Sequence, residues 1–367
     1  MSGLIVHEWL EKHGGAETVV EQFAELYPAA SIFCLWDDFP ERFPNHEVRE
    51  SWLASTPLRR RKPLALPWML PTWRRIPVSE ADWILCSSHL FAHHARLLNR
   101  DVDVPKFVYT HTPARYIWNP ELDHRGESRL VRAASAVFRG IDRRRAAEAV
   151  SIAANSKFVQ ERINATWDRP SVVINPPVDT KYFSDVPDSD SDLRDDEKRI
   201  LDELPRQFIL GASRFVPYKG LDKVIAAGEA ANLPVVLAGE GPHYPVLQQL
   251  ATEARVPVQI LRAPSRPFLR ALYQRAMVYV FPAIEDFGIM PVEAMATGTP
   301  VVANRLGGAG ESVVDRKSGI LLDDFGPREL KAAVSTACGL DESNISARAK
   351  DFDLPVFRKR VADWMKL

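Results

Sequence analysis

Short apolar runs alternate with amphipathic stretches along the whole chain, which is the pattern of a parallel α/β protein. In the first half these runs lie at 4–6, 31–35, 83–86, 106–110, 150–154 and 171–174. In the second half they lie at 207–211, 235–238, 258–261, 277–281, 300–303 and 319–322. Each run is predicted to be a buried strand, and the stretches between them are predicted to include crossover helices.

The chain is predicted to fold as two Rossmann-like domains, because its 367 residues exceed what one hydrophobic core usually holds. We place the N-terminal domain at 1–178 and the C-terminal domain at 179–354, with the stiff segment Asn175-Pro-Pro-Val-Asp179 at the exit from the first. The acidic stretch 185–203 is predicted to be a connector and a surface helix without a site. The helical tail, 355–367, is expected to pack back on the N-terminal domain.

The segment 281–300 contains the most informative loop. It follows an apolar run, and Pro291 is predicted to open a helix that stops at Gly298. Met290 cannot accept hydrogen bonds from the first amides of this helix. An uncapped helix start beyond the carboxyl end of a strand is where an α/β protein binds an anion.

Two carboxylates, Glu285 and Glu293, bracket this turn. An anion site between two acids suggests a ligand with both phosphates and hydroxyls, as in a nucleotide sugar. Two plainer interpretations stay open at this point. Glutamate is favoured in a first helical turn by the helix dipole alone, and Glu285 with Asp286 can be an exposed loop pair.

Other strand ends carry similar features. Arg214 and Lys219 follow the run at 207–211, where two cations can bind a diphosphate and stabilise its charge as it leaves, without a metal. A pair of surface cations is the alternative. Gly239 lies in a tight turn after the next run, and Pro264 lies in the segment 262–265, whose backbone groups can contact a base edge.

The N-terminal half has a Gly14-Gly15 turn between a strand and a helix, which suits a phosphate but is more often a plain turn. His111 follows the run at 106–110 and precedes a proline, so we expect it to face the cleft. His89, His93 and His94 show no acidic partner at ligand spacing. They are predicted to be surface histidines rather than metal ligands.

The stretch 56–75 interleaves basic and aromatic side chains, which suits an anionic membrane surface. The alternative is a proline-broken amphipathic segment with a solvated basic face. A second basic stretch, 125–148, is predicted to be a long helix with a solvated arginine face. The residues assigned to the membrane are Arg59, Arg60, Arg61, Lys62, Trp68 and Trp73.

Composition limits the function classes. A formal net charge of −1 gives no reason to expect nucleic acid as a partner. The three scattered cysteines form neither a disulfide framework nor a metal motif and fit a reducing cytoplasm. The first residues enter a strand without the regions of a signal peptide, and no apolar run approaches the ~18–20 residues that cross a bilayer. We expect a cytoplasmic protein, either free or peripheral on the inner face of the cytoplasmic membrane.

Five motifs together resemble the retaining glycosyltransferases of family 4, and the resemblance covers nearly the whole chain. The motifs are Gly14-Gly15-Ala16-Glu17, Tyr109-Thr-His-Thr-Pro-Ala-Arg-Tyr116, Ser213-Arg-Phe-Val-Pro-Tyr-Lys-Gly220, Gly239-Glu-Gly-Pro242 and the acid pair Glu285 and Glu293. The second of them, with Asn175-Pro-Pro-Val-Asp-Thr180, resembles bacterial mannosyltransferases that build O-antigen or exopolysaccharide repeats. Those enzymes commonly have Cys in place of Thr110 and Asp in place of Asn119.

The resemblance implies a GT-B fold, in which two parallel sheets face a central cleft that holds the donor. It places Glu293 on the ribose hydroxyls, and Arg214 and Lys219 on the diphosphate. It places Glu285 and the amides of Phe287, Gly288 and Ile289 on the sugar and the nearby phosphate.

From the N-terminal domain, the resemblance places Gly15 near the diphosphate and His111 near the reacting carbon of the sugar. In this family the acceptor is thought to attack on the leaving group's own face, with a donor phosphate oxygen taking its proton. No protein nucleophile and no metal are then required.

The sequence-based hypothesis is a metal-independent transferase of mannose from GDP-mannose to a lipid-linked or oligosaccharide acceptor in cell-surface polysaccharide synthesis. One alternative keeps the fold and uses a UDP-sugar, as a glucosyl-, galactosyl- or N-acetylglucosaminyltransferase. The other is an inactive GT-B protein that binds a sugar or lipid.

Overall fold

The computed structural model describes residues 2–12, 14–77, 80–98, 104–118, 129–185 and 192–366. The side chains of Tyr116 and of 129–137, which include Arg129 and Arg132 of the basic stretch, lie outside this description, as does Asn119. The chain divides into two compact units. Unit 1 comprises 1–177 and 357–367, and unit 2 comprises 178–356.

Unit 1 is built on a seven-stranded sheet in the order β3-β2-β1-β4-β5-β6-β7, with every neighbouring pair parallel. The apolar runs predicted six of these strands, and β3 was missed because its residues are largely exposed at the sheet edge. The strands are β1 Gly3–His7, β2 Ser31–Cys34, β3 Val48–Glu50, β4 Trp83–Ser88, β5 Lys106–Thr110, β6 Ser151–Ala154 and β7 Val172–Val173.

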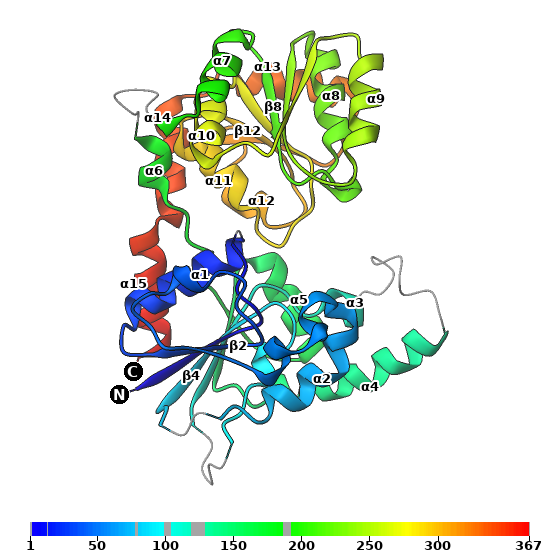
Figure 1. Ribbon diagram of the computed structural model, residues 1–367. Helices are drawn as coiled ribbons and strands as arrows, with labels where there is room; N and C mark the ends of the chain where they lie inside the picture. Colours follow the sequence, from blue (N-terminus) through cyan, green and yellow to red (C-terminus); the bar gives the residue numbers. More distant parts are fainter. Residues whose placement is uncertain are drawn as a thin grey trace. The chain divides into compact units, whose positions relative to one another are not determined.

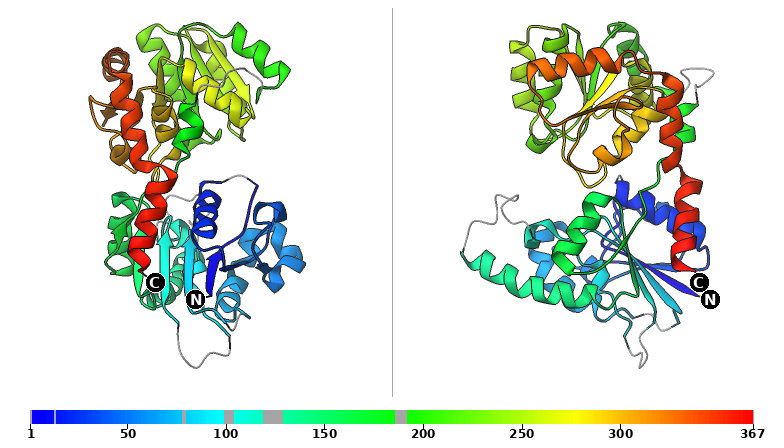
Figure 2. Two further views of the ribbon diagram at one scale, coloured as in Figure 1. Left: turned by 90° about the vertical axis from the view of Figure 1, so that its left-hand side faces the viewer. Right: turned by 180° about the vertical axis from the view of Figure 1, so that it is seen from behind.

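Helices cover both faces of this sheet (Figure 1). One face packs against α1 (Gly15–Leu26) and α15 (Leu354–Met365) (Figure 2). The rings of Phe23 and Phe357 on these helices lie 5.8 Å apart. The other face packs against α2 (Lys62–Trp73) and α5 (Lys157–Trp167) and against residues of α4. The remaining helical elements of unit 1 are η1 Pro40–Arg42, η2 Trp52–Ser55, η3 Pro57–Arg60, η4 Ala92–His94, α3 Arg115–Trp118 and α4 Arg129–Ala146.

Unit 2 has a six-stranded parallel sheet in the order β10-β9-β8-β11-β12-β13. All six strands correspond to predicted apolar runs. They are β8 Ile209–Ala212, β9 Val235–Gly239, β10 Val258–Arg262, β11 Val278–Phe281, β12 Val301–Asn304 and β13 Gly319–Leu322. Both units are therefore parallel α/β structures, as predicted.

The two faces of the unit 2 sheet carry separate cores. One packs against α8 (Leu221–Ala231), α9 (Tyr244–Glu253) and α13 (Pro327–Ala337). The other packs against α10 (Arg266–Arg275), α11 (Ile289–Ala296) and α14 (Glu342–Ala349). The shorter or peripheral elements are α6 Thr180–Ser184, α7 Asp195–Glu203, η7 Pro217–Lys219, α12 Ala309–Ser312 and η8 Lys350–Phe352.

In both sheets the strand order reverses beside the first strand. In unit 1, β2 and β3 lie on one side of β1, and the chain then crosses to form β4 on the other side. In unit 2, β9 and β10 lie on one side of β8, and the chain then crosses to form β11 on the other side. The carboxyl ends of the two strands at such a switch point diverge and leave a crevice, which is where open α/β sheets bind ligands. Ligand-binding residues are therefore expected at the two switch points, β1/β4 and β8/β11.

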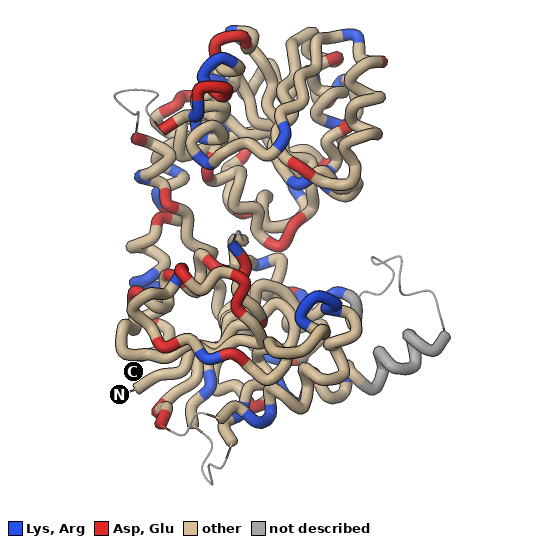
Figure 3. Tube along the Cα trace, viewed as in Figure 1, with Lys and Arg blue, Asp and Glu red and all other residues tan. Residues whose placement is uncertain are grey.

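Acidic and basic residues are interspersed along the described parts of both units (Figure 3). This mixture agrees with the formal net charge of −1. Among the described residues, no helix has the length and apolar character needed to cross a bilayer.

Candidate active site

At the switch point of unit 2 the structure brings together a cation and an acid from two separate motifs. Lys219 ends η7 after β8, Glu285 lies on the loop after β11, and their side chains form an ion pair. The Lys219 side chain is 8% exposed and the Glu285 side chain 23% exposed, so the pair lies at the boundary of the interior. Nζ of Lys219 also lies 5.8 Å from the ring centroid of Phe281.

Arg214, the second predicted cation, lies on the same turn. It is exposed and donates a hydrogen bond from Nη2 to the hydroxyl of Tyr218 at 2.8 Å. The turn therefore presents one partly shielded cation and one solvent-facing cation beside the same strand end.

The loop after β11 leads into α11, which begins at Ile289, two residues earlier than the predicted Pro291. Gly288 is the N-cap residue in a left-handed conformation (φ 82°), and no side chain caps the helix. The first amides of α11 thus have no side-chain acceptor at the cap, as the sequence predicted. Phe287 is buried and anchors the loop in the core below.

Sequence reasoning missed a second glycine loop that shapes this site. The amide of Gly308 donates to the carbonyl of Glu285 at 2.8 Å. A Cβ on Gly308 would lie 2.1 Å from Cα of Phe287, so only glycine allows the two loops to meet. The signal was present as a Gly307-Gly308 pair after the run at 300–303, in the same position as Gly14-Gly15 after the first run.

Glu293 is the fifth residue of α11, one turn inward from the helix start. The hydroxyl of Tyr273 donates to its Oε2 at 3.2 Å. Burial raises the pKa of Glu293 to about 7, although the Tyr273 hydrogen bond and the charge of Arg266 act in the opposite direction. This carboxyl therefore titrates near neutral pH.

Gly239 and Pro264 occupy loops whose observed role is to shape the sheet edge. A Cβ on Gly239 would lie 1.9 Å from the carbonyl oxygen of Ser213, so glycine lets the loops after β8 and β9 pack together. Pro264 precedes Ser265, whose hydroxyl donates to Oε2 of Glu197 at 2.8 Å. Glu197 is buried and comes from the acidic stretch predicted to carry no site, so part of that stretch supports the edge loop.

In unit 1, His111 follows β5 and lies in a hydrogen-bonded row of side chains. Its Nε2 lies 2.8 Å from Oγ of Ser87, which in turn lies 3.0 Å from Nδ1 of His7. Burial lowers the pKa of His111 to about 3, and the charges of His89 and His7 act in the same direction. His111 is therefore a neutral imidazole fixed by a serine hydroxyl.

Glu8, which the sequence did not single out, is a fully buried carboxylate one residue past β1. Its Oε1 accepts backbone hydrogen bonds from His89, Leu90 and Ala92 at 2.9–3.1 Å and one from the Ser88 hydroxyl at 3.3 Å. Burial alone would raise the pKa of Glu8. The charges of His89 and His7 and the backbone donors outweigh it and lower this pKa to about 2.

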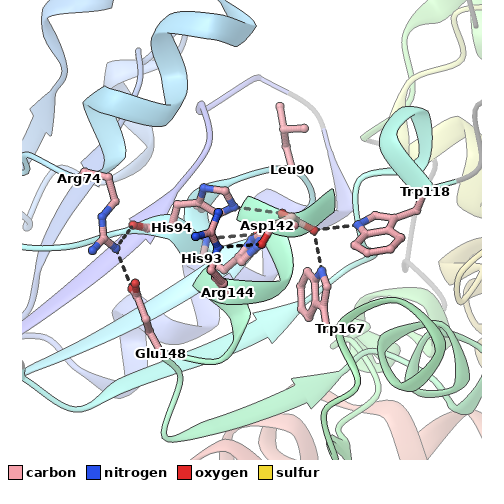
Figure 4. Close-up of polar contacts among 12 residues, drawn as sticks. Arg74, Leu90, His93, His94, Trp118, Asp142, Arg144, Glu148 and Trp167 are labelled. Atoms are coloured by element: carbon pink, nitrogen blue, oxygen red, sulfur yellow. Dashed lines mark hydrogen bonds and ion pairs between the residues drawn. The ribbon is translucent and has the colours of Figure 1, made fainter. Parts of the chain in front are cut away.

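The prediction that His93 and His94 lie at the surface is wrong. Both are buried, and an Nε2 atom of each lies 3.0 Å from Oδ1 of Asp142 on α4 (Figure 4). The indole N–H groups of Trp118 and Trp167 donate to the other oxygen, Oδ2, at 2.8 and 2.6 Å. The acidic partner was invisible in the sequence because it comes from a helix some fifty residues further on.

Gly14 and Gly15 form the start of α1. Gly14 is its N-cap residue and Gly15 its first residue, and no side chain caps the helix. A Cβ on Gly14 would lie 2.0 Å from Oε2 of Glu17, a buried carboxylate whose Oε1 accepts from the amide of Glu11 at 3.1 Å. A residue with a Cβ at position 14 would have to displace the Glu17 carboxylate, which is the end of a flexible side chain.

The basic and aromatic stretch needs one correction. Trp73 is fully buried against Phe33 and cannot contact a membrane. Arg59 pairs with Asp38, and Lys62 pairs with Glu11. The residues of the set that remain exposed are Arg60, Arg61 and Trp68.

The α2 helix continues through Pro67 and Pro71, so the segment is not broken at its prolines. Beside it lies a cavity of about 430 Å³ lined in part by Trp52 and Trp68, each of them 52% exposed. The exposed aromatic side chains therefore gather on one edge of α2.

Comparison with known proteins identifies both halves of the chain. Residues 13–182 match Glycosyltransferase Family 4, and residues 194–349 match Glycosyl transferases group 1. The chain belongs to glycosyltransferase family 4. In this family 4 protein the first match lies almost wholly in unit 1 and includes β4 but not β1, and the second lies in unit 2 and includes both β8 and β11.

Curated relatives of this family 4 chain cover only part of it. A GDP-mannose-dependent alpha-(1-6)-phosphatidylinositol monomannoside mannosyltransferase of Mycolicibacterium smegmatis is 31% identical over 186 residues, or 46% of this chain and 47% of the relative. A D-inositol 3-phosphate glycosyltransferase of Corynebacterium glutamicum is 29% identical over 214 residues, or 54% of this chain and 50% of the relative. The chain thus spans about half the length of these relatives.

Solved structures match the family 4 chain over its whole length. Anabaena Alr3699/HepE in complex with UDP-glucose has a TM-score of 0.73 and 22% identity, covering 100% of this chain and 99% of that one. WaaG, a glycosyltransferase involved in lipopolysaccharide biosynthesis, has a TM-score of 0.68 and 16% identity, covering 98% and 99%. At this identity the match establishes the GT-B fold.

Proposed function

We propose that the chain is a retaining glycosyltransferase that transfers a hexose, with mannose from GDP-mannose as the first candidate, to a lipid-linked or oligosaccharide acceptor in cell-surface polysaccharide synthesis. The observation that carries this proposal is the meeting of Lys219 and Glu285 beside the uncapped start of α11, with Glu293 one turn further in. Membership in family 4 supports the reaction class. The mannosyltransferase among its relatives supports the donor.

In this proposal each group at the unit 2 switch point has one task. Lys219 and Arg214 bind the diphosphate and stabilise the charge that grows on it as the bond to the sugar breaks. Glu293 accepts hydrogen bonds from the ribose hydroxyls. Glu285 and the first amides of α11 contact the sugar and the adjacent phosphate, so that no metal is needed for the diphosphate.

The ion pair of Lys219 with Glu285 gives this proposal a mechanical consequence. An incoming diphosphate competes for the ammonium group, and Glu285 is then released toward the hydroxyls of the sugar. Lys219 and Glu285 would then act on the donor together, because binding of the diphosphate to Lys219 is what releases Glu285 from the ion pair.

A UDP-sugar is the second candidate donor, and one observation favours it. The structural neighbour Alr3699/HepE was solved with UDP-glucose. An inactive sugar- or lipid-binding protein on the same fold is the third candidate, and the presence of Arg214, Lys219, Glu285 and Glu293 argues against it.

We further propose that unit 1 contacts anionic membrane on the inner face of the cell through Arg60, Arg61 and Trp68. Exposed indole and guanidinium groups on one segment suit the interface between headgroups and acyl chains. Such a contact would keep the enzyme near a lipid-linked acceptor.

The test of the donor proposal is a thermal-shift panel of GDP, UDP, dTDP and ADP, with and without EDTA. A selective shift with GDP that EDTA does not change is the expected result. A selective shift with UDP would keep the enzyme class and replace mannose as the sugar. No shift with any nucleotide would overturn the enzyme in favour of the inactive protein.

A further inference from the structure

Three side chains at the switch point of unit 1 have no task in the donor chemistry. His7 is the last residue of β1, Glu8 follows it, and His89 comes directly after β4. His7 and Glu8 are fully buried, while the side chain of His89 is 27% exposed. Two imidazoles and a carboxylate thus lie in the crevice where a sheet of this topology binds its ligand.

Each of the three carries an atom that has no hydrogen bond within the described part of the chain. These atoms are Nε2 of His7, Oε2 of Glu8 and Nδ1 of His89. Oε2 of Glu8 lies 3.1 Å from Nδ1 of His89, yet the two are not aligned as a hydrogen bond. A buried carboxylate oxygen that lacks an aligned hydrogen bond is costly, because the hydration it loses is not fully replaced.

The remaining atoms of these groups are held in place by other parts of unit 1. Oε1 of Glu8 accepts three backbone N–H groups, so the carboxylate cannot rotate. Nδ1 of His7 lies 3.2 Å from the carbonyl oxygen of Ser87 and 3.0 Å from its hydroxyl. Ligands of a metal ion are usually fixed in this way, because hydrogen bonds to their outer atoms set their tautomer and direction.

We propose that His7, Glu8 and His89 bind a divalent transition-metal ion. One ligand atom from each of them lies within 4.8 Å of the other two, which is the span that a single ion can bridge. Two imidazoles and one carboxylate are a ligand set that Zn²⁺ accepts, with a fourth position for water. The partial exposure of His89 leaves a route for that water or for a hydroxyl group of a substrate.

The neighbouring group of His93, His94 and Asp142 also has ligand atoms within 4.8 Å, but it suits an ion less well. Oδ2 of Asp142 already accepts two indole N–H groups. The ammonium group of Lys106 donates to the carbonyl of His93 at 2.9 Å, so a second cation would meet a like charge. All three side chains are buried, which leaves no open position for water.

The metal site shares no residue with the groups assigned to the donor, although Ser87 joins His7 to His111. A nucleotide shift that EDTA leaves unchanged is therefore compatible with it. The two proposals fail separately: the nucleotide panel decides on the donor, and the metal content of the purified protein decides on the ion.

The test measures metal binding directly on the full chain in a Cys338→Ser background, because Cys338 is the exposed one of the three cysteines. The protein is first stripped of metal with a chelator. Binding of Co²⁺ is then measured by visible absorption, and binding of Zn²⁺ is measured in a separate sample by elemental analysis after gel filtration. We expect about one equivalent per chain, with His89→Gln and Glu8→Gln weakening the affinity by more than about 100-fold. His46→Gln is the matched control, because His46 is a histidine of unit 1 bonded to the carbonyl of Ala24 outside the cluster.

Ser87→Ala gives a finer check because it keeps all three ligands and removes one support of His7. It should weaken the affinity by about 10–100-fold without changing the stoichiometry. Less than about 0.1 equivalent in the wild-type chain would overturn the proposal. So would unchanged binding in His89→Gln, or loss of the ion in His94→Gln alone, which would assign it to Asp142 instead.

Discussion

The two switch points of this molecule lie at equivalent places in two sheets, and they hold different chemistry. At β8/β11 a lysine and a glutamate form an ion pair near the surface, beside an uncapped helix. At β1/β4 three imidazole rings lie close to one another, and two of them, His7 and His89, contact the buried Glu8, whose second oxygen has no hydrogen bond among the described residues. The topology provides the crevice in both cases, and the side chains decide what it can bind.

Glu8 and Asp142 of unit 1 differ from Glu293 of unit 2 in their hydrogen-bond donors. Unit 1 buries Glu8 and Asp142 among N–H donors, and their pKa values fall although burial alone would raise them. In unit 2 the partly buried Glu293 has a single hydroxyl donor, and its pKa rises to about 7. Asp142, with both oxygens occupied by donors, holds unit 1 together, whereas Oε2 of Glu8 and the Glu293 carboxyl keep capacity for a ligand.

The largest expected effect tests the structural half of this comparison. Asp142→Ala leaves two indole and two imidazole groups without their acceptor in the core of unit 1. We expect a loss of about 3–5 kcal/mol of stability, because several buried donors lose their acceptor at once. All nine tryptophans of the chain lie in unit 1, so urea unfolding followed by tryptophan fluorescence measures this unit alone.

Glu161→Gln is the control for that experiment, since Glu161 is an exposed acid on α5 in the same unit. Its unfolding midpoint should match that of the wild type. An Asp142→Ala variant as stable as this control would mean that the buried cluster adds nothing to the fold.

The placement of the candidate residues of unit 2 could be predicted in large part from the sequence, because they lie close to strand ends. Each functional group lies within a few residues of a strand end, and strand ends are visible as the last residues of apolar runs. The position of Lys219 opposite Glu285 follows once β8 and β11 are placed as neighbours. What could not be predicted was the Gly307-Gly308 contact and the support from Glu197, because both join segments far apart in sequence.

The chemistry of unit 1 escaped prediction for the same physical reason. His93 and His94 were expected at the surface because no acid stands near them in the sequence, yet α4 brings Asp142 against them. Glu8 gave no signal either, since a single acid after a strand is common and its three donors come from the segment after β4. Burial of Trp73 depends likewise on α2 packing against β2.

The second prediction concerns the functional half of the comparison. Lys219→Ala removes the shielded cation from the unit 2 switch point. It should raise the activation free energy of transfer by about 2.7–4 kcal/mol, which lowers the rate by about 10²–10³-fold. The measurement is donor turnover at saturating nucleotide sugar. Lys331→Ala on α13 is the control, because it removes an exposed lysine from the same unit. If both variants turned over donor equally well, the electrostatic account of this site would be wrong.

The third prediction asks whether the exposed cations of unit 1 serve binding rather than folding. Arg60→Ala with Arg61→Ala should reduce binding to vesicles of anionic lipid by about 2 kcal/mol, or roughly 30-fold, because each basic residue contributes about 1 kcal/mol near such a surface. Trp68→Ala should weaken binding to the same vesicles through loss of its exposed indole. Arg328→Ala with Lys331→Ala removes the same charge from an exposed helix of unit 2 and is the matched control. Equal binding by the two double variants would remove the membrane role from this segment.

The smallest expected effect sharpens the contrast between saturated and unsaturated carboxylates. If Glu293 accepts the ribose hydroxyls, it must be ionised when the donor binds. Its raised pKa, about 7, places the change in a measurable range: affinity should be constant above that pH and fall by about tenfold per unit below it. GDP-mannose is the suitable probe, because its diphosphate has no proton to lose near neutrality, and calorimetry between about pH 6 and 8 gives the affinity.

Glu293→Gln should bind more weakly at high pH and show no such slope. Tyr273→Phe removes the hydroxyl that favours the ionised form, so it should move the midpoint to higher pH. A wild-type affinity that stays flat across this range would show that Glu293 is not the group that reads the ribose.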